Sequence, residues 1–342
     1  MEDPIEKFDI NGPGTEGKIF GLPYSIELSK LVIIPIPWEA TVTYGTGTAN
    51  APDAILKSSR QIDFFLREIP DAWKLGIAML PVPIEIKNES DRLRLLVDQY
   101  HLAESNNSEQ SSLISTKINE ACESLNIYVN KTTQKYLGEG KMVGLLGGDH
   151  STPLGFIRTL AEKHDRFGIL HIDAHADLRK SFEGFTYSHG SIMFNALKSS
   201  SISKLVQVGI RDFCDEEFKL IQRSQGRIKT FFDDDLKVSL SQGKSWESLC
   251  AEIVRDLPEK VYISFDIDGL DPKLCPHTGT PVPGGLEFYQ ATFLIKAVAT
   301  SGRTIIGFDL NEVAPGGDTD WDANVGARIL WQLCNWMGVG RT

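Results

Sequence analysis

The sequence RFGILHIDAHADLR, residues 166–179, places a short apolar run directly before a group of acidic and histidine residues. The run FGILHID, residues 167–173, is rich in aliphatic side chains and is typical of a buried strand. In extended backbone, residues two apart face the same side, so Asp173, His175 and Asp177 are expected to converge on one point. This segment therefore predicts a buried strand with a polar site at its carboxyl end.

Strands and helices are expected to alternate on both sides of this segment. Predicted strands cover residues 31–37, 75–80, 141–146, 204–209, 260–266 and 303–309, and predicted helices begin near Pro52 and cover 152–164, 190–199, 245–257, 287–300 and 321–336. The pattern predicts an α/β fold with a mostly parallel sheet that is covered on both faces. In such sheets, ligands bind at the carboxyl ends of the strands.

The length of 342 residues is compatible with one large α/β domain. We expect a single domain over residues 1–342, with an N-terminal extension over about residues 1–28. The polar run AESNNSEQSS predicts a surface loop over about residues 103–114.

Composition and charge restrict the function. The formal net charge of -11 disfavours nucleic-acid and anionic membrane partners and suits a small cationic substrate. The opening sequence MEDPIEKFDINGPG has neither a basic nor an apolar leader, and no run approaches the roughly 18 apolar residues of a membrane span. The five cysteines are scattered without a CxxC pair, which is typical of reduced thiols. We therefore expect a cytoplasmic protein.

Two further predicted strands end in metal-binding residue types. His150 follows the strand at 141–146, and Asp266 and Asp268 follow the strand at 260–266. A lone aspartate at a strand end is usually a turn residue or a helix cap, but the joint pattern favours a metal centre. The candidate ligands are His150, Asp173, His175, Asp177, Asp266 and Asp268.

The charge of this predicted cluster points to bound cations. Four carboxylates gathered at one edge of a sheet would repel one another, and two divalent ions would restore the balance. A set rich in oxygen and without thiolates suits an ion such as Mn²⁺, with Ni²⁺, iron or zinc as alternatives. His189, in the loop after the DAHAD segment, is a further candidate that could reach over the metals, whereas His171 is expected to be a core residue or to lie behind the site.

Six motifs occur in an order that resembles the ureohydrolase family of arginases and agmatinases, and the resemblance is closest to the agmatinases. They are GGDHS (147–151), DAHADLR (173–179), YSHGS (187–191), SFDIDGLDP (264–272), TGTPVPGGL (278–286) and GFDLNEVAP (307–315). The segment PWEATVTYGTGTANAPDAIL is similar to the family's first loop, so the resemblance covers most of the chain. It implies a three-layer α/β/α sandwich that assembles as a homo-oligomer, either a trimer or a hexamer.

The resemblance also implies a metal centre and its chemistry. One Mn²⁺ would be held by His150, Asp173, Asp177 and Asp266, and the second by Asp173, His175, Asp266 and Asp268. Two such ions roughly 3.5–4 Å apart would lower the pKa of a water between them. Glu312 would pair with the guanidinium group and His189 would carry a proton to the departing amine, with Asp177 as a further catalytic residue. Without the resemblance, Glu312 would be interpreted as a capping residue after a strand.

The sequence indicates the type of reaction more narrowly than it indicates the substrate. The loop between Asp177 and His189 is short and resembles that of agmatinases, which favours agmatine as substrate and putrescine plus urea as products. Arg179 could bind a carboxylate, as in arginine, guanidinobutyrate or formiminoglutamate, or could pair with Glu183. Asp212 could receive a substrate amine. An inactive regulatory or binding homologue is the alternative of another class, and the full set of candidate ligands disfavours it.

Overall fold

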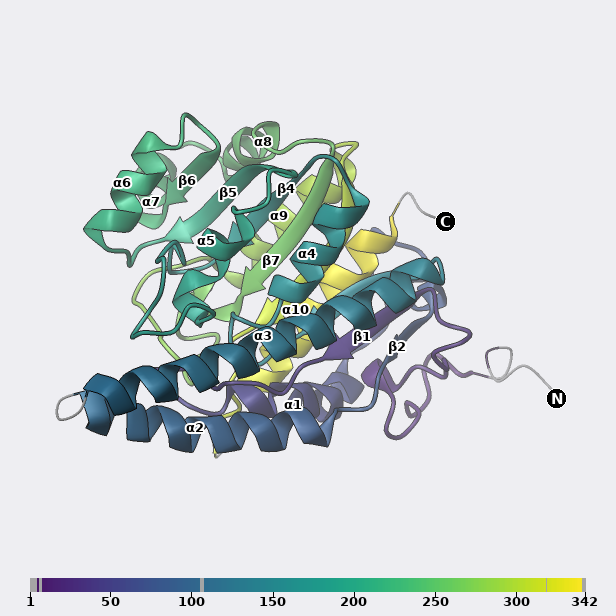
Figure 1. Cartoon of the computed structure of the whole chain (residues 1–342). Helices are drawn as coiled ribbons and strands as arrows, with labels where there is room; N and C mark the ends of the chain where they lie inside the picture. The colour runs from purple at the N-terminus through teal and green to yellow at the C-terminus, as the bar shows by residue number, and fades with distance from the viewer. Residues whose placement is uncertain (1–4, 6–7, 105–107, 318, 340–342) are drawn as a thin grey trace.

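Eight parallel strands form one sheet in the computed structural model, which describes residues 5, 8–104, 108–317 and 319–339 (Figure 1). The strand order is β2-β1-β3-β8-β7-β4-β5-β6. The strands are β1 (Leu31–Pro35), β2 (Ile77–Met79), β3 (Met142–Leu146), β4 (Phe167–Ile172), β5 (Ile202–Ile210), β6 (Ile228–Phe232), β7 (Lys260–Asp266) and β8 (Thr304–Asn311). The carboxyl ends of β3, β8, β7 and β4 are therefore neighbours, because all pairings are parallel.

The sheet is buried on both faces, which explains why its strands are continuous apolar runs. In β1, Ile33 belongs to one hydrophobic core, and Val32 and Ile34 belong to the other. Helices α3 and α4 cover one face and α9 and α10 cover the other (Figure 1). The expected three-layer α/β/α sandwich with a mostly parallel sheet is confirmed, and every pairing in the sheet is parallel.

The helices alternate with most of the strands. They are α1 (Ala51–Ser58), α2 (Ile84–Glu104), α3 (Ser108–Gly138), α4 (Leu154–Lys163), α5 (Ile192–Ala196), α6 (Asp215–Arg223), α7 (Asp233–Ser241), α8 (Trp246–Arg255), α9 (Phe288–Thr300) and α10 (Trp321–Gly338). The predicted helices therefore correspond to α1, α4, α5, α8, α9 and α10. The elements α2, α3, α6, β6 and α7 lie in parts of the sequence for which no element was predicted.

The loop predicted over residues 103–114 is wrong for most of its length. Helix α2 ends at Glu104 and α3 begins at Ser108, so the described part of this segment is almost all helical, and residues 105–107 lie outside the described residues. Glu109, Gln110 and Ser112 face solvent, while Ile114 and Ile118 are buried with the helical spacing of an amphipathic helix. The two helices form a long antiparallel hairpin, here called the α2–α3 hairpin (Figure 1).

The described part of the expected N-terminal extension contributes to the core. Ile19, Phe20 and Leu22 are buried, and the Phe20 ring meets the Trp331 ring of α10 at a centroid distance of 4.9 Å. The organisation as one domain over residues 1–342 stays a prediction.

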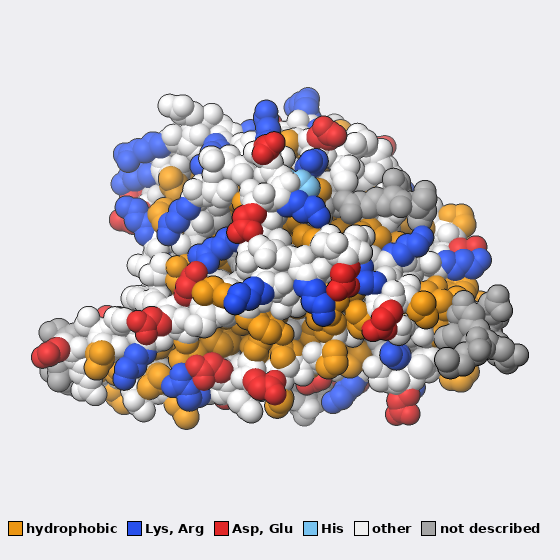
Figure 2. All heavy atoms as spheres, turned by 45° about the vertical axis from the view of Figure 1, so that its right-hand side comes forward, with side chains coloured by type: hydrophobic (Ala, Val, Ile, Leu, Met, Phe, Trp, Pro, Cys, Tyr) orange, Lys and Arg blue, Asp and Glu red, His pale blue; other side chains and the backbone are white. Residues whose placement is uncertain are grey.

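The surface carries both signs of charge. On the face shown in Figure 2, acidic and basic side chains are interspersed, and its described residues present no continuous basic surface of the kind that binds phosphate backbones. None of the helices in the described ranges is long and apolar enough to cross a membrane.

Candidate active site

The loops after β3, β4 and β7 carry the six predicted ligands to one point. Asp173 directly follows β4, Asp266 ends β7, and Asp268 lies in the 3-10 turn Ile267–Gly269. His150 lies in the turn after β3. Because these strands are close neighbours in the sheet, side chains far apart in the sequence meet at its carboxyl edge.

His150 is surrounded by carboxylates. Its Nδ1 atom lies 3.1 Å from Asp173 Oδ2, 3.2 Å from Asp177 Oδ2 and 3.1 Å from Asp266 Oδ2. The other ring nitrogen, Nε2, lies 2.8 Å from the hydroxyl of Ser264, which fixes the orientation of the ring. One half of the predicted metal centre is thus brought together.

His175 and Asp268 form the other half. His175 Nδ1 lies 3.0 Å from Asp268 Oδ2 and 3.5 Å from Asp173 Oδ1, so Asp173 lies between the two halves. The backbone N–H of His175 donates to Asp173 Oδ1 at 2.6 Å, and that of Ala174 donates to Asp268 Oδ1 at 3.0 Å. These bonds set the carboxylates in place independently of any ligand.

Two groups of side chains have donor atoms close enough to hold an ion, and Asp173 belongs to both. The first contains His150, His171, Asp173 and Asp177, and the second contains Asp173, His175 and Asp268. His171 was expected in the core or behind the site; it is buried, and its Nε2 lies 2.7 Å from Asp173 Oδ2. Its place two residues before Asp173 on the same strand face is the signal that could have assigned it to this contact.

Asp309 is a further buried acid that sequence reasoning missed. It lies on β8, between β3 and β7, and its Oδ1 accepts hydrogen bonds from Ser264 Oγ at 3.1 Å and from Asn311 Nδ2 at 2.6 Å. Burial raises the pKa of Asp309 to about 6. Since Ser264 also contacts His150, Asp309 supports the cluster from behind.

The protonation of the cluster reflects its excess of carboxylates. Burial, together with the nearby Asp173 carboxylate, raises the pKa of Asp177 to about 7. Burial also raises the pKa of Asp266, with Asp268 and Asp173 adding to the effect. Burial alone would lower the pKa of His150, but the surrounding carboxylates raise it well above its usual range. Without a bound cation, the cluster therefore keeps protons on His150, Asp177 and Asp266 that offset part of its negative charge.

Glu312 lies beside this cluster, after β8. Its Oε1 accepts the backbone N–H of His150 at 2.8 Å, and its own backbone adopts a φ of 62°. The hydroxyl of Thr278, in the TGTPVPGGL motif, donates to the Glu312 carbonyl at 2.7 Å. Burial and the neighbouring Asp149 raise the pKa of Glu312. The carboxylate is thus anchored to the loop that carries His150.

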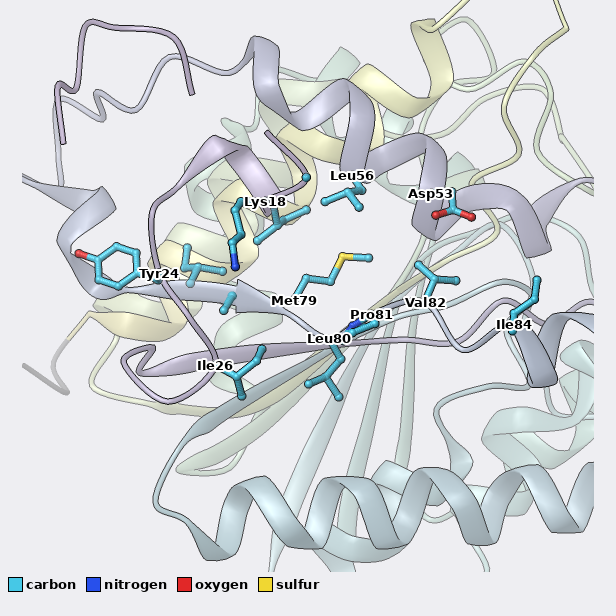
Figure 3. A pocket seen from close by; sticks show the side chains of 14 residues that line it. Lys18, Tyr24, Ile26, Asp53, Leu56, Met79, Leu80, Pro81, Val82 and Ile84 are labelled. Carbon is cyan, nitrogen blue, oxygen red and sulfur yellow. The ribbon is translucent and has the colours of Figure 1, made fainter. Parts of the chain in front are cut away.

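A pocket of about 140 Å³ opens beside the cluster. Three of the remaining predicted site residues, His189, Arg179 and Asp212, line this pocket, and Glu312 does not. The full lining is Thr43, His175, Asp177, Arg179, Phe182, His189, Gly190, Asp212, Glu217 and Thr280. A larger cavity of about 480 Å³ lies along the edge strand β2, lined by residues such as Lys18, Tyr24 and Met79 (Figure 3). It contains none of the predicted site residues, so the smaller pocket is the candidate active site.

The model of the Arginase family matches residues 29–335. The chain belongs to the arginase family. It is therefore a ureohydrolase, an enzyme that hydrolyses guanidino C–N bonds, and the family depends on a binuclear metal centre.

Individual members of the arginase family show the extent of the similarity. The chain is 32% identical over 299 residues to N(1)-aminopropylagmatine ureohydrolase of Thermus thermophilus, covering 86% of this chain and 85% of that protein. It is 34% identical over 220 residues to guanidinobutyrase of Pseudomonas aeruginosa, covering 62% and 66%. The solved agmatine ureohydrolase of Thermoplasma volcanium superposes with a TM-score of 0.72 at 23% identity, covering 94% of each chain.

In this ureohydrolase, Arg179 lies over the pocket but is not paired as expected. Its guanidinium carbon lies 4.8 Å from the Phe182 ring centroid, and its Nε lies 3.8 Å from Glu217 Oε2. Glu183 instead faces His101 at 3.4 Å, so the suggested pair between Arg179 and Glu183 is not formed. Among the described residues, no carboxylate lies within hydrogen-bonding distance of the Arg179 guanidinium.

His189 and Asp212 line the same pocket as His175. The His189 ring meets the Phe182 ring edge-on at 5.7 Å, and burial together with the nearby His175 and His150 lowers the pKa of His189 to about 4. Asp212 Oδ2 lies 3.9 Å from His175 Nε2, and its side chain is 67% exposed. A neutral imidazole and an exposed carboxylate thus both border the same pocket.

Proposed function

We propose that this ureohydrolase holds two Mn²⁺ ions and hydrolyses agmatine to putrescine and urea. The observation that carries the proposal is the position of Asp173, whose two carboxylate oxygens face the two halves of the cluster. We assign His150, Asp173, Asp177 and Asp266 to one ion and Asp173, His175, Asp266 and Asp268 to the other.

The donor set fits such ions. It consists of imidazole nitrogens and carboxylate oxygens without a thiolate, a combination that suits Mn²⁺ and also accommodates Ni²⁺. When bound, two divalent ions would supply a nucleophile from water at neutral pH and would neutralise the four carboxylates.

The protein's own residues position the substrate and move the proton. Glu312 would pair with the guanidinium and orient it, and Asp177 would accept hydrogen bonds at the reacting end. Because the pKa of His189 is lowered, its imidazole is neutral at pH 7, so it can accept a proton and pass it to the departing amine. Asp212, at the exposed rim, would receive the terminal ammonium of agmatine.

A panel of guanidino compounds tests the assignment. Protein loaded with Mn²⁺ would be incubated separately with agmatine, N(1)-aminopropylagmatine, arginine, guanidinobutyrate and guanidine, and urea would be measured. The highest kcat/KM is expected with agmatine. Absence of urea with every compound would favour the alternative of an inactive regulatory or binding homologue.

Arg179 favours a second candidate substrate, a guanidino acid such as guanidinobutyrate. Its guanidinium borders the pocket, and both oxygens of Glu217 already accept backbone N–H groups, from Leu178 at 2.9 Å and Cys214 at 2.8 Å. A substrate carboxylate could therefore bind to Arg179.

Substitution of Arg179 separates the two substrates. If a guanidino acid is the substrate, Arg179→Met should lower its kcat/KM by roughly 10-fold to 100-fold, because a hydrogen bond to a charged group is worth about 1.5–3 kcal/mol. If agmatine is the substrate, this variant should keep its activity and Asp212→Asn should raise KM instead. The kinetics of both variants on both compounds give the answer.

Replacement of His189 tests proton transfer. His189→Ala is expected to lower kcat by about 10²-fold, the lower end of the range for a general acid–base group, with a smaller change in KM. His164→Ala is the control, since His164 lies just before the amino end of β4, whereas the candidate site lies at the carboxyl ends of the strands. Equal kcat values for the two variants would contradict the role given to His189.

We also propose that the enzyme works in the cytoplasm as a homo-oligomer, a trimer or a hexamer, without nucleic-acid or membrane partners. The measured mass of the protein in solution, obtained by light scattering, tests the oligomer.

A further inference from the structure

One wall of the pocket is a tight turn, here called turn 182–185. Phe182 and Phe185 exchange two backbone hydrogen bonds, at 3.0 Å and 2.9 Å. Between them, Glu183 and Gly184 have φ angles of 50° and 82°. Two central residues with positive φ are the mark of a type I′ hairpin turn, so the segment has a defined shape of its own.

The two aromatic residues of this turn point to different places. The Phe182 ring contacts His189 edge-on and lies beneath the Arg179 guanidinium. Phe185 is buried, and its ring meets the Tyr100 ring of α2 at a centroid distance of 5.0 Å. Any movement of the turn would therefore move the surface against which His189 and Arg179 rest.

The α2–α3 hairpin holds the turn from outside. Asn119 of α3 accepts the backbone N–H of Thr186 at 2.7 Å and lies 3.5 Å from the carbonyl of Gly184. A Cβ at Gly184 would lie only 2.3 Å from the Tyr100 hydroxyl, so the turn packs directly on α2. His101, the next residue of α2, faces Glu183 at 3.4 Å.

The ends of the loop are fixed by other contacts. The backbone N–H of Arg179 donates to the Gly190 carbonyl at 3.1 Å, and Asn195 of α5 donates to the Thr186 carbonyl at 2.8 Å. Thr186 is thus held on one side by α5 and on the other by Asn119. The part that projects beyond these points, including Glu183 and Gly184, is supported by the hairpin.

We infer that Asn119 and Tyr100 are positioning residues for the substrate pocket: by holding turn 182–185, they place Phe182 against His189 and Arg179. The effect on catalysis rests on the proposed function, whereas the support of the turn does not. The α2–α3 hairpin would then determine how well the pocket holds its substrate, since His189 and Arg179 both line the pocket.

Asn119 offers a graded test. Asn119→Leu removes the acceptor for the Thr186 N–H, whereas Asn119→Asp retains it. Asn130→Leu is the matched control, because Asn130 lies on the same helix, is also half-buried, and donates to Thr159 of α4, outside the pocket. Each variant would be compared in thermal unfolding, metal content, urea kinetics and hydrogen exchange of residues 181–189 without metal.

Asn119→Leu is expected to raise KM by about 10-fold with a smaller change in kcat, and to speed exchange at 181–189 by a similar factor. Asn119→Asp keeps the acceptor for the Thr186 N–H and loses only the longer hydrogen bond from Asn119 Nδ2 to the Gly184 carbonyl, so it should restore most of both quantities. Asn130→Leu should change neither. If Asn119→Leu does not fold, Gly184→Ala should give the same increases, because the added Cβ would push the turn away from Tyr100 and would strain its left-handed backbone.

The inference would be overturned if the folded Asn119→Leu variant had the hydrogen exchange and KM of the wild-type protein. Equal effects from Asn130→Leu, or a failure of Asn119→Asp to bring exchange and KM back toward the wild-type values, would also overturn it. If the wild-type protein releases no urea from any compound, the proposed function fails, and hydrogen exchange still decides whether the hairpin supports the turn.

Discussion

Asp173→Asn is expected to lower kcat for urea release by about 10³-fold or more, which corresponds to roughly 4 kcal/mol of activation free energy. Asp173 is the residue that the two halves of the cluster share, since its oxygens face His150, His171 and His175. An amide has the shape of a carboxylate but lacks its charge, and it offers one oxygen rather than two. The variant should therefore lose the binuclear centre while keeping the packing around it.

The measurement combines urea kinetics with metal content. Asp173→Asn should bind fewer than two ions per chain after incubation with Mn²⁺ and removal of excess metal. Asp271→Asn is the control, because Asp271 lies in the same motif as Asp266 and Asp268 but accepts the backbone N–H of Lys273 outside the cluster. Full metal content and wild-type kcat in Asp173→Asn would exclude the proposed sharing of ions.

Without metal, the protein should become less stable as pH rises from 6.5 to about 8. In the unfolded chain, carboxylates lose their protons near pH 4 and histidines near pH 6.5. In the folded metal-free protein, the pKa values of His150 and His175 are raised by neighbouring carboxylates against the effect of burial, and that of Asp177 is raised to about 7 by burial. Above pH 6.5 the folded state therefore binds more protons than the unfolded state.

The sign and size follow from proton linkage. Stability falls with rising pH wherever the folded state holds the extra protons, by about 1.4 kcal/mol per pH unit for each proton. Asp173, whose pKa is lowered, is ionised in both states above pH 6.5. His171 and His189 also have lowered pKa values, and their unfolded-state protons are lost between pH 6.5 and about 7.5, which offsets only part of the fall. Bound cations displace the retained protons, so added Mn²⁺ should stabilise the protein most at the higher pH.

Thermal unfolding measured between pH 6.5 and 8, with a chelator or with Mn²⁺, checks this expectation. Heat is preferable to urea or guanidinium as the denaturant, because urea is the product of a ureohydrolase and guanidinium resembles its substrate. An Asp266→Asn variant should show a weaker pH dependence without metal, since it removes one of the crowded carboxylates. A melting temperature that rises with pH in the chelated wild-type protein would contradict the assigned protonation.

The sequence was sufficient to predict that these histidines and aspartates gather at one point because its signal is local. Each candidate ligand follows a strongly apolar strand, and parallel strands deliver their carboxyl ends to one edge. His171 was harder to assign because an imidazole within an apolar strand is equally consistent with a core position. Its spacing of two residues from Asp173 was the local signal for that contact, whereas the contact with Gln207 depends on the pairing of β4 with β5.

The α2–α3 hairpin was missed because its sequence is rich in serine, asparagine and glutamate, so that the polar run was taken for a loop. Its buried residues do recur at helical spacing, such as Leu93, Val97 and Tyr100 in α2, but few of its other positions are apolar. The partner of Glu183 could not be predicted either, because His101 comes from this unrecognised helix. Tertiary packing, rather than local propensity, decides both features.

The place of β8 between β3 and β7 has a consequence for biosynthesis. Of the eight strands it is the last to leave the ribosome, yet it fills the middle of the sheet. Until it emerges, β3 and β7 each have an unpaired edge, and the loop that carries His150 is separated from the acidic loops after β4 and β7, which already lie side by side. A nascent chain should thus complete its metal site and acquire its resistance to proteases late, only after residue 311 has left the ribosome.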